Sequence, residues 1–232
     1  MIQLKIISLI FIICAVQLAF SQVSNVEGLN PLEGVIVLKS THNEAFMPGV
    51  VFKDCDECPE MMVIPEDIKQ ISFAIGKYEI TQKQWTFIMG SNSSKNKGST
   101  LPVENVSWDD ATEFARKISI KTGHKYRLPS EAEWDAAADI NSSNQNDAYG
   151  WLGSNSDLQT HSIGLKKPNR YGLYDMVGNV WEWVQDCWNT CMYRKQKGGS
   201  YLSPGSTDLH KASFLNQNKK ESTSGFRVAR DL

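Results

Sequence analysis

The sequence predicts an α+β domain that is irregular and rich in loops. Three capping boxes, which begin at Thr81, Ser107 and Ser130, predict two or three short helices. Short apolar runs, such as residues 61–65 and 71–79, predict strands. The long stretches between these segments have no periodic pattern. Together these observations predict a few short elements held together by structured loops.

Each helix is predicted to begin by the same device. In the pairs Thr81/Gln84, Ser107/Asp110 and Ser130/Glu133, the first side chain accepts a backbone N–H and the second reaches back to the cap. Such a cap contributes about 1 kcal/mol to the stability of a helix. Apolar residues recur at helical spacing after Ser107, and Gly123 is expected to end that helix.

Further strands are predicted near both ends of the domain. The run Val35–Leu38 is expected to form one strand within an N-terminal arm. Lys197–Tyr201 and Gly225–Ala229 are expected to form two more near the C-terminus.

Composition bounds the class of protein. The 232 residues carry 24 basic and 26 acidic side chains, so no basic field is available to bind nucleic acid. The apolar fraction of 41% and the seven tryptophans indicate a packed core rather than a disordered chain.

The N-terminus has the pattern of a secretory leader. Lys5 precedes an apolar run over residues 6–20, and Ala19-Phe20-Ser21 fits the rule for cleavage before Gln22. We therefore expect a signal peptide at 1–21 and an arm or linker at 22–50. No second apolar run follows, so no transmembrane segment is expected after the signal peptide. The mature chain is expected to be periplasmic, on the cell surface or extracellular.

Removal of the leader leaves four cysteines in an oxidising environment. The simplest arrangement is two local disulfides, Cys55–Cys58 and Cys187–Cys191. The alternative is a zinc site with four thiolate ligands, because the spacing within each pair is close to that of metal sites.

The stretch Asn169–Trp183 is the densest part of the sequence in glycine, aromatic and acidic residues. It is expected to form an irregular, buried loop. Asp175 and Glu182 allow two interpretations. Both carboxylates can bind a hard cation such as calcium, or Asp175 caps a turn while Glu182 forms a buried ion pair.

This stretch resembles the signature of the formylglycine-generating enzyme family, also called the sulfatase-modifying factor family. Five further blocks follow the order of that family: Tyr78–Thr81, Pro102–Ala111, Tyr126–Trp134, Lys197–Tyr201 and Gly225–Arg230. The resemblance implies one domain over residues 51–232. It also implies a C-type-lectin-like fold with two or three short helices and short antiparallel strands.

The resemblance implies a reaction whose residues are missing here. Family members oxidise a cysteine of a client sulfatase to formylglycine with a copper ion held by two cysteines. The corresponding positions are Ser203 and Asp208. Copper is not expected, because Cu(I) prefers soft sulfur ligands. The remaining candidates for a pocket at this place are Trp181, Ser200, Tyr201 and His210, although core packing is the alternative for the two aromatic residues.

The resemblance also implies a structural calcium site. Its expected ligands are the side chains of Asp175 and Glu182 and the backbone oxygens of Gly178 and Val180.

Two functions follow as hypotheses. The first is a pseudoenzyme, an exported binding or scaffolding module of an envelope assembly that recognises a protein or peptide client. The second is a cysteine-independent oxidoreductase or maturation enzyme that modifies a secreted protein or peptide.

Overall fold

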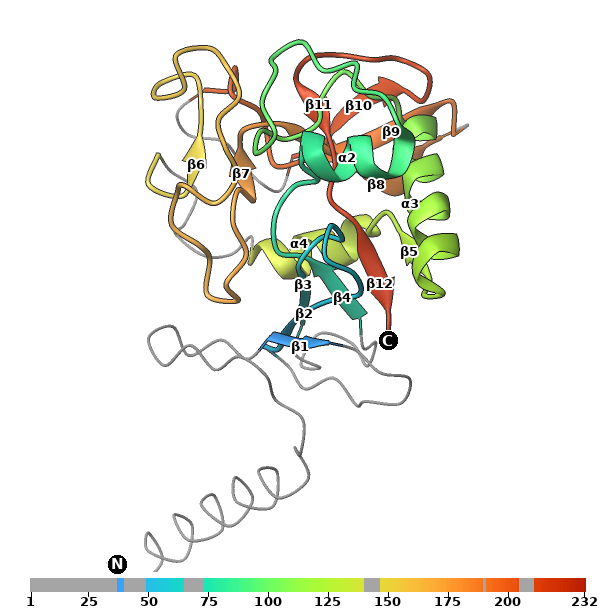
Figure 1. Cartoon of the computed structure of the whole chain (residues 1–232). Helices are drawn as coiled ribbons and strands as arrows, with labels where there is room; N and C mark the ends of the chain where they lie inside the picture. The colour runs from blue at the N-terminus through green and yellow to red at the C-terminus, as the bar shows by residue number, and fades with distance from the viewer. Residues whose placement is uncertain (1–36, 40–48, 65–72, 140–146, 190, 205–210) are drawn as a thin grey trace, which may run out of the picture.

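The computed structural model describes residues 37–39, 49–64, 73–139, 147–189, 191–204 and 211–232. The predicted leader, 1–21, and most of the predicted arm, 22–50, lie outside these residues. The described elements, in chain order, are β1 (Val37–Lys39), β2 (Val51–Lys53), β3 (Met61–Val63), β4 (Phe73–Gly76), α2 (Gln82–Met89), α3 (Trp108–Thr122), β5 (Tyr126–Arg127), α4 (Glu131–Ala138), β6 (Gly150–Trp151), β7 (Val177–Gly178), β8 (Trp181–Trp188), β9 (Tyr193–Lys197), β10 (Ser213–Asn216), β11 (Ser224–Gly225) and β12 (Ala229–Asp231) (Figure 1).

Three sheets organise the domain. The largest has six strands in the order β1-β2-β3-β4-β12-β5, and the second has four in the order β10-β9-β8-β11. The third pairs β6 with β7. Most of these pairs are antiparallel, as predicted, but β1–β2, β6–β7 and β8–β11 are parallel. Because β12 pairs with both β4 and β5, the C-terminal strand joins the first third of the chain to its middle.

The three predicted helices are confirmed. Each N-cap side chain accepts the expected backbone N–H, and each capping box is closed in both directions. Gly90 and Gly123 end α2 and α3 in the left-handed conformation, with φ of 81° and 76°. In α3 the buried face consists of Ala111, Phe114, Ala115 and Ile118.

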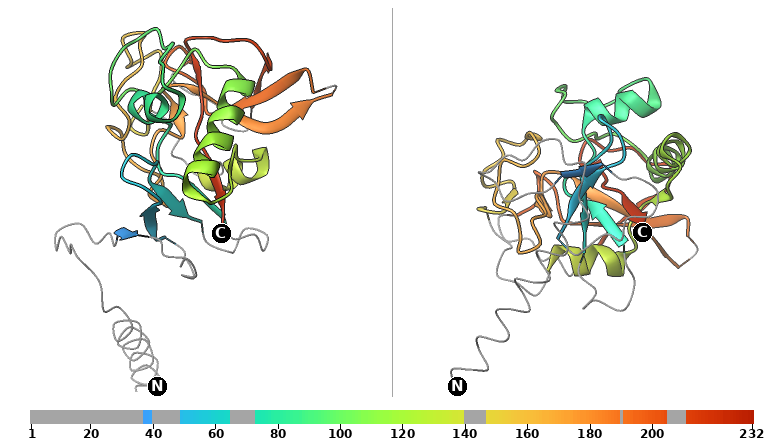
Figure 2. Two further views of the ribbon diagram at one scale, coloured as in Figure 1. Left: turned by 45° about the vertical axis from the view of Figure 1, so that its right-hand side comes forward. Right: turned by 60° about the horizontal axis from the view of Figure 1, so that its bottom comes forward.

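The apolar core lies in two clusters on either side of the larger sheet. In the first, Trp85 stacks on Phe114 with ring centroids 5.7 Å apart, and the edge of Phe226 meets both rings. In the second, Trp134 of α4 packs among residues of β4 and of the stretch Asn169–Trp183, which we call the signature loop. Figure 2 shows the resulting body of the domain, from which the β8–β9 hairpin projects.

Several predicted strand limits were wrong. The predicted strand Lys197–Tyr201 is displaced: β9 ends at Lys197, because Gly198 and Gly199 turn the chain at φ of 92° and 84°. The predicted strand Gly225–Ala229 consists of the end of β11 and the start of β12. The predicted loop Asn169–Trp183 also contains β7, and its last residues begin β8, which is eight residues long.

Candidate functional site

A tight turn after β9 holds three of the predicted site residues. Ser203 N donates to Ser200 O at 2.9 Å, and Ser203 Oγ accepts from Ser200 N at 2.9 Å. Ser200 Oγ in turn accepts from Leu202 N at 3.3 Å. Only 8% of Ser203 is exposed. Both serine hydroxyls therefore serve the backbone of the turn.

Tyr201 is a packed residue rather than the wall of an open cleft. It is 4% exposed, and its N–H donates to Asn179 O at 2.9 Å. Its carbonyl accepts from Ser156 Oγ at 2.7 Å, and its hydroxyl lies 3.2 Å from Ser222 Oγ. Trp181, at the start of β8, is half-buried.

The described residues do not fit a copper ion. The cysteines are paired as Cys55–Cys58 and Cys187–Cys191, which confirms the local disulfides and overturns the zinc alternative. Neither pair leaves a thiolate for Cu(I). The other predicted positions near the turn, Asp208 and His210, lie outside the described residues.

Glu182 forms a buried ion pair. Its Oε1 accepts from Arg227 Nη2 and its Oε2 from Arg227 Nε, both at 2.7 Å, while Trp134 Nε1 donates to Oε2 at 2.6 Å. Both Glu182 and Arg227 are fully buried. This bidentate geometry is the strongest that a carboxylate and a guanidinium make.

Two further carboxylates lie close to this pair. Asp175 Oδ2 accepts from Gly164 N at 2.7 Å, whereas its Oδ1 is buried and has no hydrogen-bond partner among the described residues. Glu79 accepts from Asn179 Nδ2 at 2.6 Å and from Val180 N at 3.1 Å. Burial, reinforced by the charges of Asp175 and Glu182, raises the pKa of Glu79 well above 4.5.

The predicted calcium ligands fit an ion only in part. Asp175 offers a buried oxygen without a partner, but both oxygens of Glu182 are already engaged by Arg227. Gly178 has φ of 75°, and a Cβ there would lie 2.0 Å from Trp151 O, so only glycine fits. Within the described ranges, no three acidic, histidine or cysteine side chains converge as a metal site requires. Calcium stays a prediction, and Glu182 does not fit as its ligand.

The sequence reasoning missed the residues that organise this region. Glu79 and Arg227 lie in two of the blocks that follow the order of the family, Tyr78–Thr81 and Gly225–Arg230, but nothing in their local pattern indicates a shared cluster. Asn179 was missed as well. Its side chain donates to Glu79 and accepts from His161 N at 3.0 Å, and so it bridges two loops.

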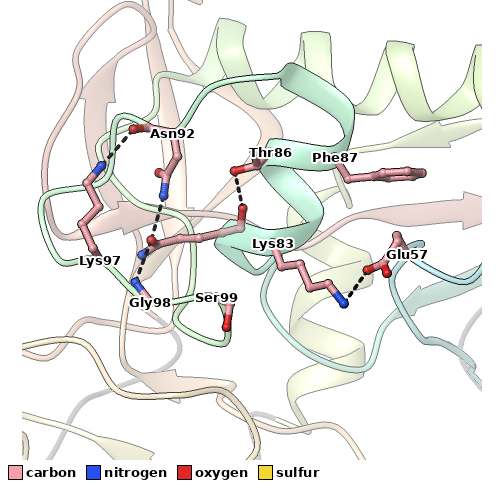
Figure 3. A pocket seen from close by; sticks show the side chains of 9 residues that line it. Glu57, Lys83, Thr86, Phe87, Asn92, Lys97, Gly98 and Ser99 are labelled. Atoms are coloured by element: carbon pink, nitrogen blue, oxygen red, sulfur yellow. Dashed lines mark hydrogen bonds and ion pairs between the residues drawn. The ribbon is translucent and has the colours of Figure 1, made fainter.

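One pocket lies away from this region, beside α2. It has a volume of about 520 Å³, and Figure 3 shows the side chains that line it. Its polar groups bind one another: Gln82 Oε1 accepts from Asn92 Nδ2 at 2.8 Å, and Lys83 pairs with Glu57 at 2.9 Å. None of the predicted site residues lines it, so we do not regard it as the functional site.

The raised pKa of Asp175 makes a testable contribution to stability. Burial raises this pKa from 3.8 to about 6. The folded state therefore holds the proton more tightly than the unfolded state, and the contribution is present below pH 4 and lost as the pH rises through 6. Asp175→Asn keeps the acceptor for Gly164 N without the charge. The measurement is urea unfolding with a chelator present. Between pH 4 and pH 7 we expect the free energy of unfolding of the wild type to fall by up to about 3 kcal/mol more than that of this variant.

Asp157→Asn is the matched control. Asp157 also has a positive φ, 50°, but its side chain is exposed. Its pH profile is expected to follow that of the wild type. If Asp175→Asn and Asp157→Asn have the same pH profile, burial does not raise the pKa of Asp175.

Comparison with known proteins places the chain in a family. Residues 42–232 match the model of the Sulfatase-modifying factor enzyme 1-like domain. A chaperone protein LppX of Paenibacillus barcinonensis is 33% identical, over 58% of this chain and 71% of the relative. The formylglycine-generating enzyme of Streptomyces coelicolor is 29% identical, over 63% and 58% respectively. An inactive C-alpha-formylglycine-generating enzyme 2 of Mus musculus is 30% identical, over 62% and 50%.

Structural comparison agrees. PvdO from Pseudomonas aeruginosa superposes with a TM-score of 0.68 at 25% identity, covering 81% of this chain and all of PvdO. The chain spans about half the length of the formylglycine-generating enzymes that it matches. Because the family model matches residues 42–232 and the fold agrees, the chain belongs to the sulfatase-modifying factor family, with the fold of the formylglycine-generating enzymes.

Proposed function

We propose that this protein is an exported binding module that recognises a protein or peptide client and does not oxidise cysteine. The observation that carries the proposal is the turn at residues 200–203. The family's first copper ligand corresponds to Ser203, and here the Ser203 hydroxyl caps the turn by accepting from Ser200 N. A hydroxyl in this position supports the fold of the loop but supplies no soft ligand.

The relatives support a binding role for the domain. One is named a chaperone protein and another an inactive formylglycine-generating enzyme, so the family includes members described by roles other than catalysis. Since this chain spans about half of several relatives, their activities and clients are not carried over to it. The recognised client is therefore proposed only as a class, a protein or peptide.

Export, to the periplasm, the cell surface or the medium, is part of the proposal. The two disulfides are stable in an oxidising compartment, which supports this location. No helix within the described ranges combines the length and the apolar character needed to cross a bilayer. Membership of an envelope assembly is a further part of the proposal.

Calcium binding at Asp175 remains a proposal with its own test. Calcium takes oxygen ligands, and Asp175 Oδ1 is a buried oxygen without a partner in the described part of the chain. If it binds calcium, the wild type melts several degrees higher in 1 mM calcium than in chelator, and Asp175→Asn shows no difference. Equal melting temperatures for the wild type under both conditions would remove calcium from the account.

The absence of cysteine oxidation is tested with a peptide that carries a sulfatase-type cysteine motif. The purified protein, supplied with Cu(I) and oxygen, is expected to leave the cysteine unchanged, as judged by peptide mass and by an aldehyde-specific aminooxy probe. The enzyme from Streptomyces coelicolor is the positive control. Formation of an aldehyde by this protein refutes the proposal and favours the cysteine-independent oxidoreductase.

A further inference from the structure

Four of the ten exposed large apolar side chains among the described residues lie close together. Of the large apolar residues with substantial exposure, four lie on the β8–β9 hairpin and the adjacent β10. We call them the aromatic face: Trp188, Met192, Tyr193 and Phe214, which are 41% to 55% exposed. The rings of Trp188 and Phe214 are 4.6 Å apart, and Tyr193 is the cross-strand partner of Trp188. Clusters of exposed Trp, Tyr, Phe and Met are typical of protein interfaces.

The aromatic face is one part of a face of the four-stranded sheet, and α4 covers the other part. The register places Glu182, Lys195 and Lys197 on the same face as Trp188 and Phe214. Over Glu182 and the lysines, α4 forms the cover: Trp134 donates to Glu182, Asp135 pairs with Lys197 at 2.8 Å, and Glu131 pairs with Lys195. Beyond α4 the same face continues with aromatic residues, and the hairpin projects from the body there (Figure 2).

The strand next to this face lies at the edge of its sheet. In the described part of the chain the sheet order ends at β10. Alternate N–H and C=O groups of an edge strand point away from its neighbour and can pair with another strand. Ser213–Asn216 contains neither proline nor a charged residue, the usual protections of an edge.

Charge indicates what kind of segment can pair there. Between Met192 and Lys220 the sequence contains six basic residues and one acidic residue, Asp208. Three of these basic residues pair with acidic residues of α3 and α4. Lys219, just after β10, is exposed. An acidic segment beside β10 would complement the charge of Lys219.

We propose that the aromatic face and the edge of β10 bind an extended polypeptide segment in which apolar and acidic residues alternate. The segment adds a strand to β10. Its apolar side chains pack against Phe214 and the ring of Trp188 beside it, and its acidic side chains lie toward Lys219. This inference deepens the proposed function, since it names the surface at which a client is held.

The probe is a fluorescein-labelled peptide, acetyl-Glu-Val-Glu-Phe-Glu-Val-Glu-amide, and binding to the full chain with its disulfides intact is measured by anisotropy. We expect Phe214→Ala to weaken binding roughly tenfold, because it removes one of the two adjacent rings against which the peptide packs. Phe87→Ala is the matched control, since Phe87 is 43% exposed and Phe214 41%. It is expected to change binding less than about twofold. Unchanged melting temperatures show that both variants are folded.

A second probe tests strand pairing itself. The same peptide, N-methylated at every residue, keeps its side chains but loses its backbone donors, and we expect no binding. Binding that survives N-methylation, equal effects of the two phenylalanine variants, or no binding of the first peptide would each overturn the proposal. So would Phe214-dependent binding to phosphatidylglycerol vesicles without peptide binding, which would identify a lipid surface instead. None of these results affects the aldehyde assay, so the two proposals fail separately.

Discussion

The guanidinium of Arg227 is the group on which the arrangement of the signature region depends. It binds both oxygens of Glu182 on β8, donates to Gly76 O at the end of β4, and donates to Tyr174 O in the signature loop, the last two at 2.9 Å. The chain near residue 76, the stretch 174–182 and Arg227 itself are far apart in the sequence, and they meet at this side chain. A buried guanidinium requires a hydrogen-bond acceptor for each of its donors. Without it, these buried acceptors would lack a hydrogen-bond donor.

The same cluster fixes the strand that leads to the turn at Ser200–Ser203. Strand β8, fixed by Glu182, leads into the hairpin with β9, and Gly198 and Gly199 then turn the chain into Ser200–Ser203. That turn is closed by hydrogen bonds of its own backbone and serine hydroxyls, so its geometry does not depend on a metal. The same strands also carry the aromatic face.

The parts of the fold that could be predicted are those determined by neighbouring residues. Capping boxes involve residues three apart, and all three helices begin where Thr81, Ser107 and Ser130 predict. The local disulfides are confirmed for the same reason. Strand limits were less accurate, because pairing with distant strands decides them. The partner of Glu182 is 45 residues away and that of Glu79 is 100 residues away, so no local pattern could connect them.

Arg227 neutralises a group of buried carboxylates, and urea unfolding of two variants at pH 7 tests this role most directly. Arg227→Met leaves Glu182, Glu79 and Asp175 buried without their cation and is expected to lower the free energy of unfolding by about 3–5 kcal/mol. Glu182→Gln leaves Arg227 beside two remaining carboxylates and is expected to lower it by clearly less. If Glu182→Gln is as destabilising as Arg227→Met, the pair is an isolated ion pair, and Arg227 does not organise the cluster.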